Sequence, residues 1–308
     1  PQETLLIEKQ LAAYYEQNSD WERAIAIYSR IGTTEQQVEL ICNAAPSMIV
    51  RGRLVTLSEW MDKLPAQLVD HTPELISIRG SIAMLRGEFA SSLSLLNRSI
   101  TAMQETDAVE GLGYALIRRS AVNRHMGHYK EARQDAVDAI ELTQQPGGNK
   151  QQYAEALRSE GLVYFQIGEL NSALDKLEQS YERFSEMNLN SDAAKVLVDI
   201  GCVYDAMGDI NKAEACFSKS LAFWQKANSA LWQANLLNNI GVIQFQRGKY
   251  VEAIITLEKA LSYSRISANP RLESYTLASM GDLFSHLNSI KEARQAYQLA
   301  AEILEQTN

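Results

Sequence analysis

Residues 161–180 read GLVYFQIGELNSALDKLEQS, and this stretch returns three times at a spacing of 40 residues. The later copies are GCVYDAMGDINKAEACFSKS at 201–220, GVIQFQRGKYVEAIITLEKA at 241–260 and GDLFSHLNSIKEARQAYQLA at 281–300. Each copy has a glycine, then an aromatic residue or glutamine, then glycine or asparagine, then alanine, a large apolar residue and a small one. A fixed period of this length indicates an array of repeated supersecondary units.

The spacing inside each copy predicts a pair of helices. Offsets of three and four residues place Gly161 and Tyr164 on one face of a first helix, and they place Ala173 with Leu177 on one face of a second. Gly168 lies between them, where glycine can take the positive φ that ends a helix. Small residues let the two antiparallel backbones approach closely. One pair cannot bury its apolar stripe alone, so the pairs are expected to stack into a solenoid.

The same register continues upstream in weaker form, which predicts helices along the whole chain. We expect an all-α fold, a right-handed superhelical solenoid of about eight antiparallel helix pairs. It forms a single helical-repeat domain over 1–308, with two shorter atypical pairs in 1–70, two divergent repeats in 71–143 and four regular repeats in 150–308. The expected helices are 3–17, 21–31, 34–51, 53–63, 73–86, 90–103, 109–126, 130–143, 152–166, 171–184, 192–206, 211–226, 231–246, 251–266, 271–286 and 291–305.

Two segments interrupt the pattern. Residues 144–149, QQPGGN, form the Pro-Gly-Gly cluster of the chain, and we interpret them as a long turn between repeats because the next unit resumes in register. The segment from Leu64-Pro65 to Pro73 is expected to be a proline-bounded connection between the shorter early pairs and the longer later ones.

Composition excludes several classes of protein. The net charge is −9 and the pI is about 5.1, which disfavours direct nucleic-acid binding by this segment. Three cysteines without a CxxC pair argue against a disulfide framework and favour a reducing cytoplasm. No apolar run has the length of a membrane span or a signal-peptide core. The first residue is Pro1, which we interpret as a segment excised from a longer protein.

No catalytic or metal-binding pattern occurs in the sequence. His125 and His128 flank a predicted helix end, where capping is a simpler explanation than a metal site. HExxH, GxSxG and DxDxDG motifs are absent, and the carboxylates on the helices are explained by solvated faces. We therefore expect no enzyme activity, no catalytic residue, no metal and no cofactor.

The repeated positions resemble the tetratricopeptide repeat over nearly the whole chain. The Gly-x-x-Tyr start, the later glycine, the alanine and the large apolar residue match that family's pattern at Gly161 to Leu177. The spacing of 40 exceeds the family's 34, Gln244 and Asn123 depart from the aromatic position, and Asn288 departs from the glycine position. Longer helices in the same fold are the expected consequence.

An earlier segment resembles a second family. Leu57-Ser-Glu-Trp60-Met-Asp-Lys-Leu64-Pro65 is similar to the Trp-Leu-x-x-Leu-Pro segment in the sensor repeats of MalT-like bacterial transcription regulators, which are LuxR-type signal-transduction ATPases. In that family, ATPase and DNA-binding domains lie elsewhere in the full-length chain. No Gly-x-x-x-x-Gly-Lys-Ser/Thr loop occurs in this sequence, so only the sensor role carries over. Trp60 is equally explained as a core aromatic, and Pro65 as a helix stop.

The first helix of each pair is expected to line a concave groove. Its exposed positions supply a mixture of arginine, amide and aromatic side chains, which can hydrogen-bond a ligand and stack on its apolar parts. The predicted ligand- or partner-binding residues are Tyr114, Arg118, Arg124, Arg158, Phe165, Gln166, Asn235, Asn238, Asn239 and Phe245.

Two clusters in this groove have competing explanations. Arg118, Arg119, Arg124 and Arg158 concentrate positive charge that would suit an acidic peptide or phosphate, or they pair internally with nearby Asp and Glu side chains, among them Asp135, Glu155 and Glu160. The second cluster, Asn238-Asn239, resembles the asparagines with which tetratricopeptide grooves hold a ligand's main chain. Its alternative is a hydrogen bond between neighbouring repeats.

Two functions follow as hypotheses. The first is a non-catalytic sensor module of a MalT-like transcription regulator, which binds a small-molecule inducer or a protein in the groove. The second is a stand-alone tetratricopeptide adaptor or peptide receptor that binds an extended peptide. Both place the protein in the cytoplasm, with a protein or peptide as partner and with neither nucleic acid nor membrane bound by this segment.

Overall fold

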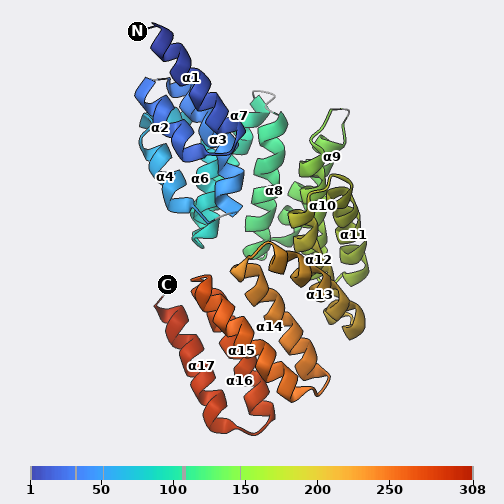
Figure 1. The fold of residues 1–308 in the computed structure, drawn as a ribbon. Helices are drawn as coiled ribbons and strands as arrows, with labels where there is room; N and C mark the ends of the chain where they lie inside the picture. Colours follow the sequence, from blue (N-terminus) through green and yellow to red (C-terminus); the bar gives the residue numbers. More distant parts are fainter. Residues whose placement is uncertain (1, 32, 51, 106–108, 146, 307–308) are drawn as a thin grey trace. The chain divides into compact units, whose positions relative to one another are not determined.

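The computed structural model describes residues 2–31, 33–50, 52–105, 109–145 and 147–306, and in these ranges it is all-helical, without a strand. Figure 1 shows the helices in chain order. They are α1 (Gln2–Gln17), α2 (Trp21–Ile31), α3 (Thr34–Val50), α4 (Leu54–Asp62), α5 (Ala66–His71), α6 (Pro73–Leu85), α7 (Phe89–Glu105), α8 (Val109–His125), α9 (Tyr129–Gln144), α10 (Lys150–Gln166), α11 (Leu170–Glu186), α12 (Asn190–Ala206), α13 (Ile210–Lys226), α14 (Ala230–Gln246), α15 (Tyr250–Ile266), α16 (Pro270–His286) and α17 (Ile290–Glu305).

The prediction of an all-α repeat fold is confirmed, and each expected helix is present within a few residues of its expected bounds. One expectation was wrong. The connection between Leu64 and Pro73 contains the short helix α5, whose first turn closes on the Pro65 carbonyl, which accepts from the Leu68 amide at 2.9 Å. Val69 on this helix is buried. Pro65 is the N-cap of α5 and Pro73 is the first residue of α6, because proline is compatible with the start of a helix.

The chain divides into two compact units, residues 1–159 and 160–308, and the boundary lies within α10. The expectation of a single domain over 1–308 stays a prediction. Within each unit the helices pack as sequential neighbours, α6 with α7 and α8 with α9 in the first, and the hairpins from α12 to α17 in the second.

The first unit begins with an apolar cluster that extends from α1 to α6. Leu57, Trp60, Met61 and Leu64 all belong to it, and Trp60 is only 7% exposed. The segment that resembles the regulator family is therefore part of the core, as an amphipathic helix predicts.

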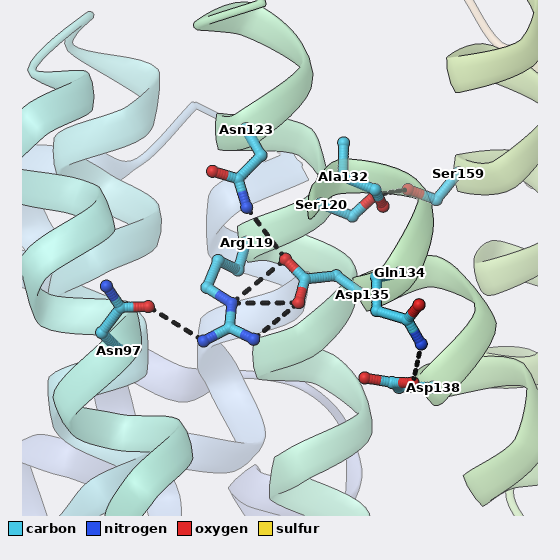
Figure 2. Close-up of polar contacts among 9 residues, drawn as sticks. All are labelled: Asn97, Arg119, Ser120, Asn123, Ala132, Gln134, Asp135, Asp138 and Ser159. Atoms are coloured by element: carbon cyan, nitrogen blue, oxygen red, sulfur yellow. Dashed lines mark hydrogen bonds and ion pairs between the residues drawn. The ribbon is translucent and has the colours of Figure 1, made fainter. Parts of the chain in front are cut away.

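In the divergent repeats of the first unit, a serine hydroxyl forms a hydrogen bond between the two helices of a hairpin. Ser92 Oγ donates to the Gly80 carbonyl at 2.7 Å, from the second helix of a hairpin to the first. In the next hairpin the direction reverses, because Ser120 Oγ donates to the Ala132 carbonyl at 2.7 Å (Figure 2). Each bond joins the two helices of one hairpin and involves a buried serine, so the hydroxyl is accommodated without leaving a polar group unsatisfied.

Glycine at the start of each regular repeat faces the large apolar residue of its partner helix in the second unit. A Cβ added at Gly161 would lie 2.8 Å from Leu177 Cγ, and one at Gly241 would lie 2.7 Å from Leu257 Cγ. At Gly201 the added atom would collide with the ring of Phe217. The two helices are therefore so close that a side chain at the glycine position would collide with the large residue on the partner helix.

The turns use positive φ as predicted. Gly168, Gly208 and Gly248 have φ of 82°, 78° and 73°, and Asn288 takes the fourth position with φ 57°. The sequence pattern did not identify a second set of such turns, between successive hairpins. There Asn188 and Asn228 have φ of 58° and 51°, and the position 40 residues on is Ala268, with φ 48°. Alanine is the costliest of these residues in this conformation.

We expect Ala268→Asn to stabilise the chain by about 0.5–1 kcal/mol, because asparagine adopts the left-handed conformation more readily than alanine. Urea unfolding followed by helical circular dichroism measures the change. Ala227→Asn is the matched control, since Ala227 ends a helix with φ −79°. An equal gain in both variants would contradict the backbone explanation.

Gly201→Ala should destabilise the second unit, because the new methyl group meets the Phe217 ring. Overpacking costs about 1–3 kcal/mol, while alanine returns about 1 kcal/mol of helix propensity. Leucine occupies the equivalent of Phe217 in two other repeats, so Phe217→Leu should relieve part of the clash. A double-mutant cycle in urea should give a favourable coupling of about 1 kcal/mol. Simple additivity would show that the helices are not in close contact at this glycine.

Candidate functional site

The predicted site residues lie on three helices and in both units. Tyr114, Arg118 and Arg124 are on α8, and Arg158 is on the part of α10 that belongs to the first unit. The others lie in the second unit, with Phe165 and Gln166 at the end of α10 and Asn235, Asn238, Asn239 and Phe245 on α14. The candidate site thus consists of one group of residues in each unit.

In the first unit, Tyr114 and Arg118 line an open cavity of about 390 Å³. The cavity lies between α3, α6 and α8, and α6 packs against both of the other helices. Sequence reasoning identified the two α8 residues and missed the other walls, since the contributions of α3 and α6 depend on how the shorter early pairs pack. The lining residues are Cys42, Asn43, Ala45, Pro46, Glu74, Ser77, Ile78, Met103, Gly111, Tyr114 and Arg118.

The four arginines singled out from the sequence have different hydrogen-bond and ion-pair partners. Arg119 is held by Asp135 through a 2.6 Å ion pair and also donates to Asn97 Oδ1 at 2.9 Å. Figure 2 shows that Asn123 donates to the same carboxylate, at 3.0 Å. Arg158 pairs with Glu155 at 3.2 Å. Internal pairing, the alternative weighed from the sequence, therefore accounts for Arg119 and Arg158.

Burial is costly for the Asp135 carboxylate. Its side chain is 5% exposed, and desolvation raises its pKa although Arg119 and Asn123 act in the opposite direction. The raised pKa means that the charged form is less stable here than in water, even with its partners. This ion pair joins α8 to α9, and a buried pair of this kind is weak evidence of added stability.

Arg118 has a different environment from its neighbour. Its Nη1 donates to Ser77 Oγ at 3.0 Å, and its guanidinium lies 5.6 Å from the centre of the Tyr114 ring. Desolvation lowers the pKa of Arg118 to about 10. Among the residues that the structure describes, no carboxylate lies within ion-pair distance of Arg118. Arg124, in the last turn of α8, is partly buried.

In the second unit, two asparagines on α14 present carbonyl oxygens with no hydrogen-bond partner among the described residues. The atoms are Oδ1 of Asn235 and Oδ1 of Asn238, which lie three residues apart and therefore on one face of the helix. Both oxygens are buried within the chain's own surface. Unsatisfied buried acceptors carry an energetic cost. Asn239 is also partly buried, on the next position of α14.

A small apolar cleft adjoins Asn235 between α14 and α16. It holds about 230 Å³ and its lining includes Leu231, Trp232, Leu272 and Tyr275. The Tyr275 side chain is 55% exposed, and Leu231 is 40% exposed. Trp232 stacks on Trp224 with ring centroids 5.1 Å apart, which fixes one wall of the cleft. Asn269 and Arg271 complete the lining.

Phe245 has packing partners at the other end of α14. Its ring lies 5.2 Å from the His286 ring and 6.3 Å from the Tyr250 ring, and the Tyr250 hydroxyl is 3.1 Å from His286 Nε2. Phe165 is partly buried and Gln166 is exposed. These contacts assign Phe245 a structural role between neighbouring hairpins in addition to any contact with a ligand.

Thiol chemistry has little support. All three cysteines are free and partly buried, and desolvation raises the pKa of Cys42 and of Cys202 to about 12. Such thiols stay protonated at neutral pH and are poor nucleophiles. Within the described residues, no three His, Cys, Asp or Glu side chains group as metal ligands. None of the described helices is long and apolar enough to cross a membrane.

Comparisons with known proteins agree with the helical repeats. A family model described as tetratricopeptide repeat matches residues 112–186, 192–266 and 232–306. No curated protein is matched by sequence.

Three solved structures are similar to the chain. A Rap protein in complex with competence and sporulation factor is 13% identical, with a TM-score of 0.66, 100% of this chain and 99% of that one being covered. The apo form of RapI is 14% identical, with a TM-score of 0.64 and 98% of both chains covered. BtubC from P. vanneervenii is 16% identical, with a TM-score of 0.57, over 72% of this chain and 91% of that one. At these identities the similarity shows the fold alone.

Removing Arg119 should be more harmful than removing the whole ion pair. Arg119→Met leaves the buried Asp135 charge without its cation, and we expect a loss of about 3 kcal/mol in the free energy of unfolding. The triple variant Arg119→Met, Asp135→Leu, Asn123→Leu should recover most of that loss, because it removes the buried charges together with the Asn123 amide that donates to Asp135. Urea unfolding measures both. A triple variant less stable than Arg119→Met alone would show that the polar cluster itself is stabilising.

Proposed function

Because the chain belongs to the tetratricopeptide repeat family, we propose that it is a non-catalytic binding module that holds a peptide or protein segment against α14 and α16. The observation that carries this proposal is the pair of asparagines Asn235 and Asn238 on one face of α14, of which Asn235 lines an apolar cleft. The two half-buried amide side chains lie three residues apart on one helix face, which suits the main-chain groups of an extended segment.

The cleft beside Asn235 would supply the apolar part of the recognition. A space of about 230 Å³ walled by Trp232, Leu272 and Tyr275 suits one aliphatic or aromatic side chain of the bound segment. Burying such a side chain contributes about 1.5–3 kcal/mol. The amide bonds set the orientation of the segment, and the cleft selects its side chain.

The similar structures support a peptide as the ligand class. The Rap protein was solved in complex with competence and sporulation factor, and its fold is similar to this chain over its whole length. The proposal does not depend on shared residues, because only 13% of them are identical. It depends on the asparagines and the cleft, which belong to this chain.

A narrower hypothesis makes the chain the sensor module of a MalT-like transcription regulator in the cytoplasm. Its support is the segment from Leu57 to Pro65, whose apolar residues lie in the core of the first unit. Because these residues are buried, their similarity to the regulator family indicates similar core packing and says little about a common ligand. The sequence of the complete gene tests the hypothesis, because a Gly-x-x-x-x-Gly-Lys-Ser/Thr loop encoded upstream would support it and no such loop would favour a separate adaptor.

Peptide capture is tested with the double variant Asn235→Ala, Asn238→Ala. Binders are selected for the native chain from a library of short random peptides and measured by fluorescence anisotropy. Loss of two neutral hydrogen bonds should weaken binding about tenfold or more. Melting of the free protein should not fall, because unsatisfied oxygens are removed and alanine is the better helix former.

The matched control is Gln225→Ala, which removes an exposed amide from α13. It should leave affinity unchanged. Equal affinity in the double asparagine variant, or equal loss in the control, would refute the assignment of these side chains to the ligand.

A further inference from the structure

Successive hairpins of the second unit contact each other through repeated positions. On a first helix, two of these positions lie five residues before and two residues after the small residue that faces the second helix of the same hairpin. Counted from Gly241 in α14, they are Leu236 and Ile243. Both are buried in one cluster with Phe217 and Trp224 of α13. The first helix of one hairpin therefore covers an apolar stripe on the second helix of the hairpin before it.

The other first helices follow the same pattern. In α6, α8, α10, α12 and α16 the residues at these two positions are at most 4% exposed, and all of them are apolar except one threonine. They are Leu75, Ile82, Ala115, Val122, Ala156, Val163, Val196, Val203, Thr276 and Leu283.

Helix α1 has the register of a first helix. Ala12 is fully buried and lies 12 residues before Ala24, which is also the separation of Gly241 from Ala253. Ser19 follows Ala12 by seven residues and has a positive φ of 57°. The turn glycines of the regular repeats have the same offset and the same sign of φ. The contact positions of α1 can therefore be counted from Ala12.

These positions of α1 are exposed, unlike those of the first helices compared above. They are Ile7 and Tyr14, which are 59% and 60% exposed, and Leu11 between them is also exposed. Spacings of four and three residues place the three side chains in one stripe along the helix. Helix α1 packs against α2, and among the described residues no hairpin covers this stripe.

Helix α17 leaves the other half of the same kind of contact exposed. On α13 the covered residues are Phe217 and Trp224, both buried. Their equivalents 80 residues later, two repeats along the chain, are Tyr297 and Leu304, which are 41% and 38% exposed. Ala301 lies between them and is exposed as well. The outer stripe of α17 thus has the residue types that a following first helix covers in the preceding repeats.

The polar residues beside the two stripes are also compatible. Between α13 and the end of α14, Glu214 pairs with Arg247 at 2.6 Å. The equivalent position on α17 is Arg294, and the equivalent position after α1 is Asn18, and both are exposed. Asn18 donates its Nδ2 to the Tyr14 carbonyl at 2.7 Å, and its side-chain oxygen can accept from a guanidinium.

We propose that copies of this chain associate end to end, with α1 of one molecule packed on α17 of the next. The contact reproduces the packing of a first helix on a second helix that already occurs between hairpins of the chain. Its occupant is a second copy, because α1 is the one helix of those compared that has the matching residues exposed. The two faces are different, so the contact is heterologous and can add further copies. It is separate from the peptide surface proposed for α14 and α16.

The first test is the mass of the native 308-residue chain in solution, measured by sedimentation velocity over a range of concentrations. Dimers and then longer species should form as the concentration rises, and dilution should return them to monomers. A monomer at every concentration would overturn the proposal.

Two variants that each block one face identify the contact. Ile7→Glu places a charge in the α1 stripe, and Ala301→Glu places a charged side chain in the middle of the α17 stripe. Each variant alone should stay monomeric. An equimolar mixture should form dimers and nothing larger, because one intact α1 face and one intact α17 face remain. A mixture that stays monomeric would refute the contact. So would dimers of Ile7→Glu alone, which would show that α17 pairs with itself.

The matched controls are Val251→Glu on α15 and Val55→Glu on α4. Both valines are exposed, and the equivalents of Val251 in the other regular repeats are exposed too. Both controls add the same charge outside the two stripes and should associate as the native chain does. Equal loss of association in the controls would show that added negative charge is sufficient, and the proposal would fail. Helical circular dichroism of each variant confirms folding.

Discussion

The close approach of the two helices in each hairpin is the constraint on which the other features depend. It requires that one helix has almost no side chain where the other has a large one, as at Gly201 opposite Phe217. Where the first unit has serine, a hydroxyl bonded to the facing carbonyl permits a similar contact, as at Ser120. At these points one face of the first helix packs against the second helix of its own hairpin. The other faces of the first helix contact neighbouring hairpins or are available to a ligand.

This division explains why polar groups on the first helices are incompletely satisfied. A helix that packs on two sides has no freedom to turn its remaining polar residues toward water. Asn235 and Asn238 on α14 are in that position, and so is Arg118 on α8. The fold tolerates such groups because the free-energy cost of each one is smaller than the stabilisation from the many apolar contacts around it. Binding sites in repeat proteins arise where this cost is left for a partner to remove.

The periodic sequence predicted the repeats and most helix bounds, because glycine, alanine and large apolar residues at fixed offsets are direct consequences of helix packing. It did not predict the helix α5, since Pro65, which follows the end of α4 as expected of a helix stop, is also the N-cap of the next helix. It identified Tyr114 and Arg118 but not Glu74, because α6 contributes to the same cavity through packing between pairs that have no common period. It grouped the four arginines together and could not distinguish which of them had an internal partner.

That last distinction depends on rotation about a helix axis. Side chains one residue apart on a helix differ by about 100° in direction, so Arg118 and Arg119 leave α8 toward different neighbours. Arg119 faces α9, where Asp135 supplies a carboxylate at 2.6 Å, whereas Arg118 faces α6, where Ser77 supplies a neutral hydroxyl. The contact with Asp135 neutralises the Arg119 charge and joins α8 to α9. The second leaves a guanidinium that is oriented and partly desolvated but not neutralised, which is the state that a binding arginine requires before its ligand arrives.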